Sequence, residues 1–252
     1  MVWRLRILFL HRNNQIIVKM KIQKHETPQQ KEKEIEHLSF IQSNGSVSKY
    51  GLETFFEKTF NCLKEELQRL RNTIYDYNQH EYIFALNERA WVGAFNNAIL
   101  RALPDSTVTL QEFGVYDKKH FIGRADFLVY WKDKNNKPLY LLFEAKQYEE
   151  TIKSELLDDA TEYLHTVRIQ GQKYFDAEEE TEYYKDKNVL VIPIAFGWIR
   201  KPDFLNEAKK YFEGGEKKDK STDFCSLYFE GEHGAWVYGK IYDARESITL
   251  LK

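Results

Sequence analysis

The sequence predicts an α/β fold in which helical segments precede and separate the strands of a sheet. Residues 52–77 and 87–102 place apolar side chains at intervals of three or four, which is the spacing of one helix face. Beyond Pro104 the pattern changes to short runs rich in β-branched and aromatic residues, which favour strands. Residues 189–196 are almost wholly apolar, as in a strand that is covered on both faces.

The elements after Pro104 follow from local patterns of hydrophobicity and turn residues. The segment 154–175 has one apolar face and a heavily acidic opposite face, which indicates a helix. A polar turn over 132–137 joins two apolar runs into a hairpin. In chain order we expect strands at 107–115, 126–131 and 139–144, the helix at 154–175, a strand at 189–196, a helix at 203–212, and a last hairpin of 224–229 and 235–242.

The first 49 residues are expected to form a weakly ordered lead-in to a single domain over 50–252. Residues 20–49 are rich in Lys, Gln and Glu, and such a composition buries little apolar surface. The apolar run 7–10 is too short for a signal-peptide core. No later run approaches the roughly 18 apolar residues of a membrane helix. We therefore expect a cytoplasmic protein without a membrane partner.

Composition bounds the function classes. The chain has 252 residues, of which 42% are apolar, so it is long enough to bury a substantial core. The net charge of −2 gives no overall attraction for nucleic acid, although a local basic groove stays open as an interpretation. Cys62 and Cys225 lack the spacing of a zinc site or a disulfide framework, and two thiols exclude a four-thiolate iron–sulfur cluster within one chain. A reducing compartment fits this cysteine content.

Two carboxylates are predicted to face each other across the first hairpin. Acidic-x-Lys triplets occur several times in the chain, but only Glu144 ends an apolar strand whose partner begins with another carboxylate, Asp126. If the turn is centred on Asn135, both carboxylates lie nine residues from that centre and oppose each other. Opposed like charges are destabilising, and a cation between them would turn repulsion into coordination.

Lys146 completes a set of groups suited to phosphodiester hydrolysis. It lies two residues beyond Glu144 and therefore projects from the same side of the strand. The reaction needs oxygen ligands for Mg²⁺, a positioned water, and positive charge where the transition state becomes more negative. The pattern predicts a Mg²⁺-dependent phosphodiesterase in which Mn²⁺ can substitute. The alternative is an ordinary charge pair near the end of a surface hairpin.

Three short motifs make residues 88–196 resemble the PD-(D/E)XK nuclease superfamily. Gly123-Arg124-Ala125-Asp126 resembles its Gly-x-x-Asp variant, and Glu144-Ala145-Lys146 resembles its second motif. Gln170-Gly171-Gln172-Lys173-Tyr174 is similar to the Gln-x-x-x-Tyr helix motif of the RecB-like branch. The resemblance implies a restriction-endonuclease-like αβββαβ core over about residues 80–200 with a central mixed sheet. An N-terminal helical addition and a C-terminal β-hairpin would flank it.

The resemblance also implies roles for the residues of these motifs. Asp126, Glu144 and the carbonyl of Ala145 would hold the metal, and Lys146 would orient the nucleophile or stabilise the transition state. Glu88, on the helix before the sheet, matches the place of a further acidic residue that assists directly or through water. A second interpretation of Glu88 is a carboxylate favoured by the dipole at a helix start.

Three further residues are candidates for substrate contact. Gln170 and Tyr174 lie one turn apart on the inward face of their helix, so they could contact the substrate backbone or order the site. Plain core packing is the alternative for both. Arg124, two residues before Asp126, is the third candidate.

The sequence therefore predicts a metal-dependent nuclease that acts on phosphodiester bonds, with DNA as the expected substrate and partner. A homodimer is compatible with it. The main alternative is a catalytically inactive module of the same fold that binds nucleic acid or a protein partner, motivated by the near-neutral charge and the aromatic content of 15%. Another phosphodiester substrate would suit the same metal site.

Overall fold

The computed structural model divides the chain into two units, Met1–Glu34 and Ile35–Lys252. In the first unit, β1 (Val2–Arg12) and β2 (Gln15–His25) pair antiparallel. The described residues are 2–12, 15–25, 34–42, 45–74, 83–105, 107–117, 120–132, 136–148, 164–165, 167–173, 188–213 and 222–245.

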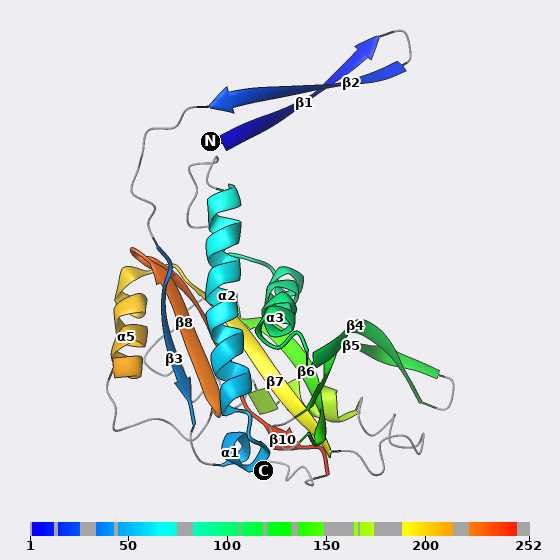
Figure 1. The fold of residues 1–252 in the computed structure, drawn as a ribbon, viewed down its shortest axis with the longest axis vertical. Helices are drawn as coiled ribbons and strands as arrows, with labels where there is room; N and C mark the ends of the chain where they lie inside the picture. Colours follow the sequence, from blue (N-terminus) through cyan, green and yellow to red (C-terminus); the bar gives the residue numbers. More distant parts are fainter. Residues whose placement is uncertain are drawn as a thin grey trace. The chain divides into compact units, whose positions relative to one another are not determined.

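The second unit is an α/β fold built on a mixed, open, eight-stranded sheet. Its strands run in the order β3-β8-β9-β7-β6-β5-β4, with β10 also beside β7 (Figure 1). The β6–β7 pair is parallel and every other pair is antiparallel. The strands are β3 (Glu36–Ile41), β4 (Thr107–Asp117), β5 (His120–Lys132), β6 (Pro138–Tyr148), β7 (Asn188–Ile199), β8 (Phe224–Glu230), β9 (His233–Gly239) and β10 (Tyr242–Asp243). The helices are α1 (Ser46–Tyr50), α2 (Glu53–Ile74), α3 (Glu88–Ala102) and α5 (Pro202–Glu213).

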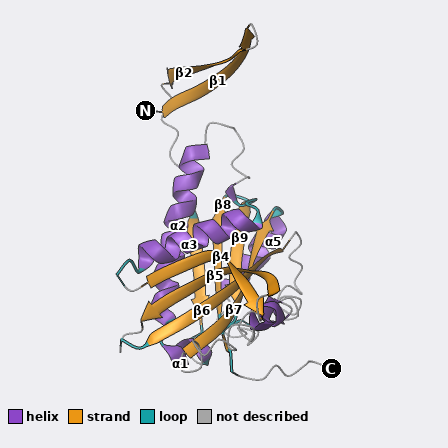
Figure 2. Ribbon diagram, turned by 90° about the vertical axis from the view of Figure 1, so that its right-hand side faces the viewer, coloured by secondary structure: helices purple, strands orange, loops and turns teal. Residues whose placement is uncertain are grey.

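Helices cover both faces of the sheet. On one face, the Phe95 ring of α3 lies 6.1, 5.9 and 6.0 Å from the rings of Phe127, Phe143 and Phe196. On the other face, Leu205 and Ala208 of α5 pack with residues of β7, β8 and β9. Figures 1 and 2 show α2 and α3 together and α5 apart from them. Strand β7 is buried along nearly its whole length because it lies between these layers, as its apolar sequence predicts.

The main unit includes residues that the sequence assigns to the N-terminal lead-in. Strand β3, within the predicted lead-in 1–49, pairs with β8 and so joins the main sheet. Ile35 is fully buried. The hydrogen bonds of β3 come from β8, which lies near the far end of the chain. The main unit therefore begins at Ile35 rather than at residue 50.

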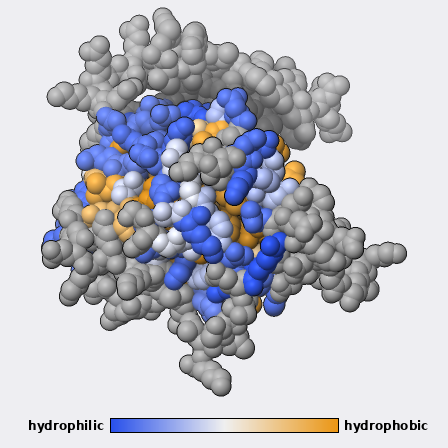
Figure 3. Space-filling model, turned by 60° about the horizontal axis from the view of Figure 1, so that its bottom comes forward, coloured by the Kyte–Doolittle hydropathy of each residue, from blue (hydrophilic) through white to orange (hydrophobic). Residues whose placement is uncertain are grey.

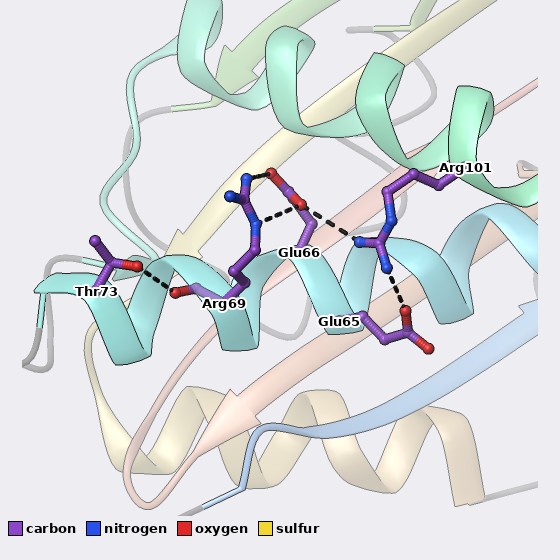
Figure 4. Close-up of polar contacts among 5 residues, drawn as sticks. All are labelled: Glu65, Glu66, Arg69, Thr73 and Arg101. Atoms are coloured by element: carbon purple, nitrogen blue, oxygen red, sulfur yellow. Dashed lines mark hydrogen bonds and ion pairs between the residues drawn. The ribbon is translucent and has the colours of Figure 1, made fainter. Parts of the chain in front are cut away.

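A charge network fixes α3 against α2. Glu66 of α2 is buried and accepts two hydrogen bonds from the Arg69 guanidinium, and this bonding lowers the pKa of Glu66. Arg101 of α3 reaches Glu65 at 2.6 Å and Glu66 at 3.4 Å (Figure 4). The Thr73 hydroxyl donates to the Arg69 carbonyl at 2.8 Å. Because Arg69 of α2 and Arg101 of α3 both contact the buried Glu66 carboxylate, α3 is held in a fixed position along α2.

The described surface is mainly hydrophilic, with separate apolar patches in the view of Figure 3. The large apolar side chains that stand exposed in the described part of the chain are Leu100, Val108 and Leu110, two of them on the edge strand β4. No helix among the described residues is long and apolar enough to span a membrane.

Candidate active site

The site lies at a fork between β5 and β6. Their antiparallel ladder runs from Lys132–Pro138 to Phe127–Phe143, which is symmetric about residue 135, so the predicted register is confirmed. The Phe127 and Phe143 rings stack at 4.5 Å on the side of α3. Beyond this pair, the described part of β5 stays bonded to β4 and β6 stays bonded to β7. Asp126 and Glu144 are the first residues past the point where the two strands separate.

Asp126 bridges the fork through its side chain. Its Oδ2 accepts a hydrogen bond from the backbone N–H of Ala145 at 2.6 Å, so a carboxylate takes the place of a strand-to-strand backbone bond. Burial raises the pKa of Asp126, and the nearby carboxylates of Glu88 and Glu112 raise it further. The Ala145 N–H and the Lys146 ammonium act in the opposite direction on that pKa.

Glu144 is the most deeply buried carboxylate of the site, with 1% of its surface exposed. Burial raises its pKa to about 8, and repulsion by Asp126 adds to the shift. The Lys146 ammonium opposes the shift and lies 4.0 Å from Oε1. The other oxygen, Oε2, has no hydrogen-bond partner among the described residues. A buried carboxylate oxygen without a partner is costly, and a cation or a bound water would satisfy it.

Lys146 and Glu88 connect the fork to the start of α3. The Lys146 ammonium lies 3.6 Å from Glu88 Oε1, and Glu88 Oε2 accepts from the Gln147 N–H at 3.0 Å. The Gln147 side chain donates to the Leu86 carbonyl at 2.9 Å. The predicted N-cap is confirmed, because Asn87 accepts from the Ala90 N–H. Four predicted residues, Glu88, Asp126, Glu144 and Lys146, are thus brought together.

Sequence reasoning missed Gln147 and Glu112. Gln147 could have been found from strand alternation, since it follows Lys146 on the opposite side of β6, toward α3. Glu112 lies between two residues of β4 that pair with β5, Gln111 opposite Phe127 and Phe113 opposite Ala125, and so stands beside Asp126. Its φ of 44° breaks the strand geometry, and no pattern in the sequence indicates that irregularity.

The helical residues 167–173 pack over the fork. A Cβ added at Gly171 would lie 2.8 Å from Val191 Cγ1 and 3.6 Å from the Glu144 Cβ. Gln170 is half-buried next to this close approach. Residues 164–165 are also helical, whereas Tyr174 and residues 154–163, 166 and 175 of the predicted helix lie outside the described residues. The Gln172 side chain donates to the Ala244 carbonyl at 2.8 Å, which ties the helix to the end of the sheet. Helix 167–173 therefore contributes to the burial of Glu144.

Gly171→Ala is expected to destabilise the protein by about 1 kcal/mol, since overpacking against a β-branched neighbour outweighs the gain in helix propensity. The measurement is the urea midpoint at constant m-value. Gly93→Ala is the matched control, because a Cβ there meets nothing within 4 Å. A midpoint that rises as far for Gly171→Ala as for Gly93→Ala would show that helix 167–173 does not press on β7.

Asp126, Glu144 and the Ala145 carbonyl offer oxygen donors, the kind of ligand that Mg²⁺ prefers, and lack the nitrogen and sulfur donors typical of zinc sites. No three His, Cys, Asp or Glu side chains of the described residues gather as a ready-made metal cluster. Mg²⁺ is usually held by one or two carboxylates and keeps several waters. Asp126, Glu144 with its unpartnered Oε2, and the adjoining carbonyl of Ala145 match that requirement.

Arg124 lies on β5 at the rim of this site. Its side chain is exposed, and its guanidinium is 3.7 Å from Glu112 Oε2.

Comparison of the chain with protein-family models, with curated proteins and with solved structures found no match.

Proposed function

We propose that the protein is a metal-dependent nuclease that hydrolyses phosphodiester bonds, with DNA as its substrate. The observation that carries the proposal is Glu144, a carboxylate that is 1% exposed, lies across a strand fork from Asp126 and keeps one oxygen unpartnered among the described residues. A structural ion pair would bond both oxygens, because an unsatisfied buried acceptor costs about 1–3 kcal/mol. If this oxygen is a ligand for a cation, the site explains why an unpartnered buried oxygen is present.

The order of elements supports a restriction-endonuclease-like core. Helix α3, strands β4, β5 and β6, the helical residues 167–173 and strand β7 follow one another as α-β-β-β-α-β. The sheet is mixed and the carboxylates lie on its inner strands. The N-terminal helix α2 and the β8–β9 hairpin correspond to the expected additions on either side of that core.

Each residue of the fork has a role in this proposal. Asp126, Glu144 and the Ala145 carbonyl hold Mg²⁺ or Mn²⁺, which when bound polarises the phosphate and acidifies a water. Lys146 places a positive charge where the phosphate oxygens become more negative in the transition state. Glu88 and Gln147 are positioning residues, because they fix the Lys146 ammonium and the end of β6.

The test is incubation of the purified protein with supercoiled plasmid, linear duplex and single strands, with Mg²⁺, with Mn²⁺ and with EDTA. We expect cleavage that requires the metal. The alternative of an inactive module, which binds nucleic acid or a protein partner, predicts no cleavage in any of these conditions. Cleavage that persists in EDTA would contradict the metal site.

Lys146→Ala is expected to slow the cleavage step by about 10²-fold, which is typical of removing one electrostatic stabiliser. Metal affinity should change little, because Lys146 is not a ligand. Single-turnover cleavage and Mg²⁺ titration separate the two quantities. Lys132→Ala, exposed at the other end of the same hairpin, is the control for loss of a lysine. If Lys146→Ala cleaves normally but unfolds more easily, Lys146 serves a structural ion pair.

A further inference from the structure

Glu112 holds a strained position beside the carboxylates. Among the described residues, only Glu112 and Asn136 combine a side chain with a positive φ, and the value at Glu112 is 44°. Asn136 lies in the connection between β5 and β6, and asparagine tolerates such a conformation, but Glu112 interrupts a strand. Backbone strain of this kind is concentrated at functional sites.

Two arginines from different elements converge on Glu112. Arg89 Nε of α3 lies 3.8 Å from Glu112 Oε1, and Arg124 Nη1 of β5 lies 3.7 Å from Oε2. Both distances exceed those of hydrogen bonds, so the two guanidiniums are held loosely. The side chains of Arg89 and Arg124 are 85% and 64% exposed, so both can reach a ligand from solvent.

The two arginines lie close to the fork. Glu112 stands beside Asp126 in the register of β4 and β5, and its charge acts on that carboxylate. Arg89 directly follows Glu88, which contacts Lys146. The arginine pair therefore flanks the candidate active site on the side of β4 and the start of α3. The chain as a whole carries a net charge of −2, so attraction for a polyanion has to come from local groups of this kind.

We propose that Arg89 and Arg124 form a phosphate clamp for the nucleic-acid backbone next to the scissile bond, and that Glu112 holds them in place until the phosphate arrives. This inference rests on the proposed function, since it names how that site holds its substrate. Guanidinium groups bind phosphate oxygens through two parallel hydrogen bonds, which Glu112 does not engage at 3.7 and 3.8 Å. The amino end of α3 adds a favourable dipole for an anion.

In this proposal Glu112 competes with phosphate for the two guanidiniums and so weakens the binding of nucleic acid. Glu112 neutralises positive charge that phosphate would use, and its own charge repels the backbone. Removing that charge should tighten binding, whereas removing either arginine should weaken it. A merely structural role of the three residues would change binding in one direction for all three variants, or would not change it.

The experiment measures the anisotropy of a short fluorescein-labelled DNA duplex in EDTA, as a function of salt, for Arg89→Gln, Arg124→Gln, Glu112→Gln and Lys58→Ala. Lys58 is an exposed lysine of α2 and controls for the loss of one positive charge. Each arginine variant should raise Kd several-fold and reduce the slope of log K against log salt by about 0.9, the value for one phosphate contact. Glu112→Gln should lower Kd, and Lys58→Ala should match wild type.

Circular dichroism and the urea midpoint confirm that each variant is folded. Arginine variants that bind like Lys58→Ala, a wild type that does not bind the duplex, or Glu112→Gln that binds more weakly would each overturn the clamp. Plasmid cleavage with Mg²⁺ is measured on the same samples and tests the proposed function separately. If the wild type cleaves and the arginine variants bind DNA as the wild type does, only the clamp proposal is wrong. If the arginine variants bind differently and no sample cleaves, only the nuclease proposal is wrong.

Discussion

Asp126→Asn is expected to abolish metal-dependent cleavage while the protein stays folded. The asparagine oxygen can still accept the Ala145 N–H that Asp126 accepts at 2.6 Å, so the bond across the fork survives. The change removes the Asp126 charge, which repels Glu144 once Glu144 is deprotonated, above about pH 8. Stability without metal should therefore be unchanged or slightly higher, whereas loss of a charged ligand should cost about 10³-fold in cleavage, or roughly 4 kcal/mol of transition-state stabilisation.

Thermal unfolding, Mg²⁺ titration and plasmid cleavage measure these effects on one sample. Asp223→Asn is a matched control, because Asp223 is also buried and accepts a backbone N–H, that of Ile241, at 2.7 Å. It lies between the start of β8 and the end of β9, on the other side of β7 from the fork, and its variant should cleave normally. Unfolding of Asp126→Asn, together with normal cleavage by its folded fraction, would show that Asp126 is a structural residue.

Glu144→Gln is expected to make the metal-free protein more stable at high pH and to abolish cleavage. The pKa of Glu144 is raised from 4.5 to about 8 in the folded protein. Between these values the folded state holds a proton that the unfolded state has released, so stability falls as pH rises through that window and stays lower above it. Below about pH 4.5 both states are protonated and the effect vanishes. The glutamine side chain of the variant carries no charge, so the variant should lack this slope and gain a few kcal/mol at high pH.

Urea unfolding in EDTA at several pH values tests the slope. In wild type, Mg²⁺ should raise the stability most above about pH 8, where the Glu144 carboxylate is already deprotonated. Below that pH the ion has to displace the proton of Glu144, so it binds more weakly. Glu144→Gln should gain nothing from Mg²⁺. If the free energy of unfolding depends on pH in the same way for both proteins, Glu144 keeps an ordinary pKa. The argument for a cation at the fork would then fail.

The register of the first hairpin was predictable because it depends on neighbours in the sequence. The polar turn and two apolar runs determine a symmetric ladder, and that ladder fixes the positions of Asp126 and Glu144. The helix start at Glu88 was likewise predictable from Asn87, whose capping bond is local. These short-range rules were enough to predict that Asp126, Glu144 and Lys146 lie together, whereas the place of Glu88 beside them was implied by the family resemblance. The roles of all four residues in catalysis remain predictions.

The parts that were missed depend on distant partners or on irregular backbone. Strand β3 owes its order to β8, and nothing in its own polar surroundings indicates that pairing. Glu112 approaches Asp126 because β4 departs from strand geometry at that residue. Arg89 faces outward at a helix start, and its relation to Glu112 is visible only when α3 is placed beside β4. Propensity and periodicity contain no information on such long-range placement.

Because β5 and β6 separate at the site, the distance between the Asp126 and Glu144 carboxylates can change. Asp126 is carried by a strand bonded to β4, whereas Glu144 is carried by a strand bonded to β7. Two contacts span the opening at that level: the Ala145 N–H donates to Asp126, and the backbone N–H of Asp126 donates to the Glu144 carboxylate. The spacing of the two carboxylates is thus set by the splay of β5 from β6. A small ion with rigid coordination distances selects a narrow range of splay, whereas a larger and more tolerant ion such as Ca²⁺ accepts many.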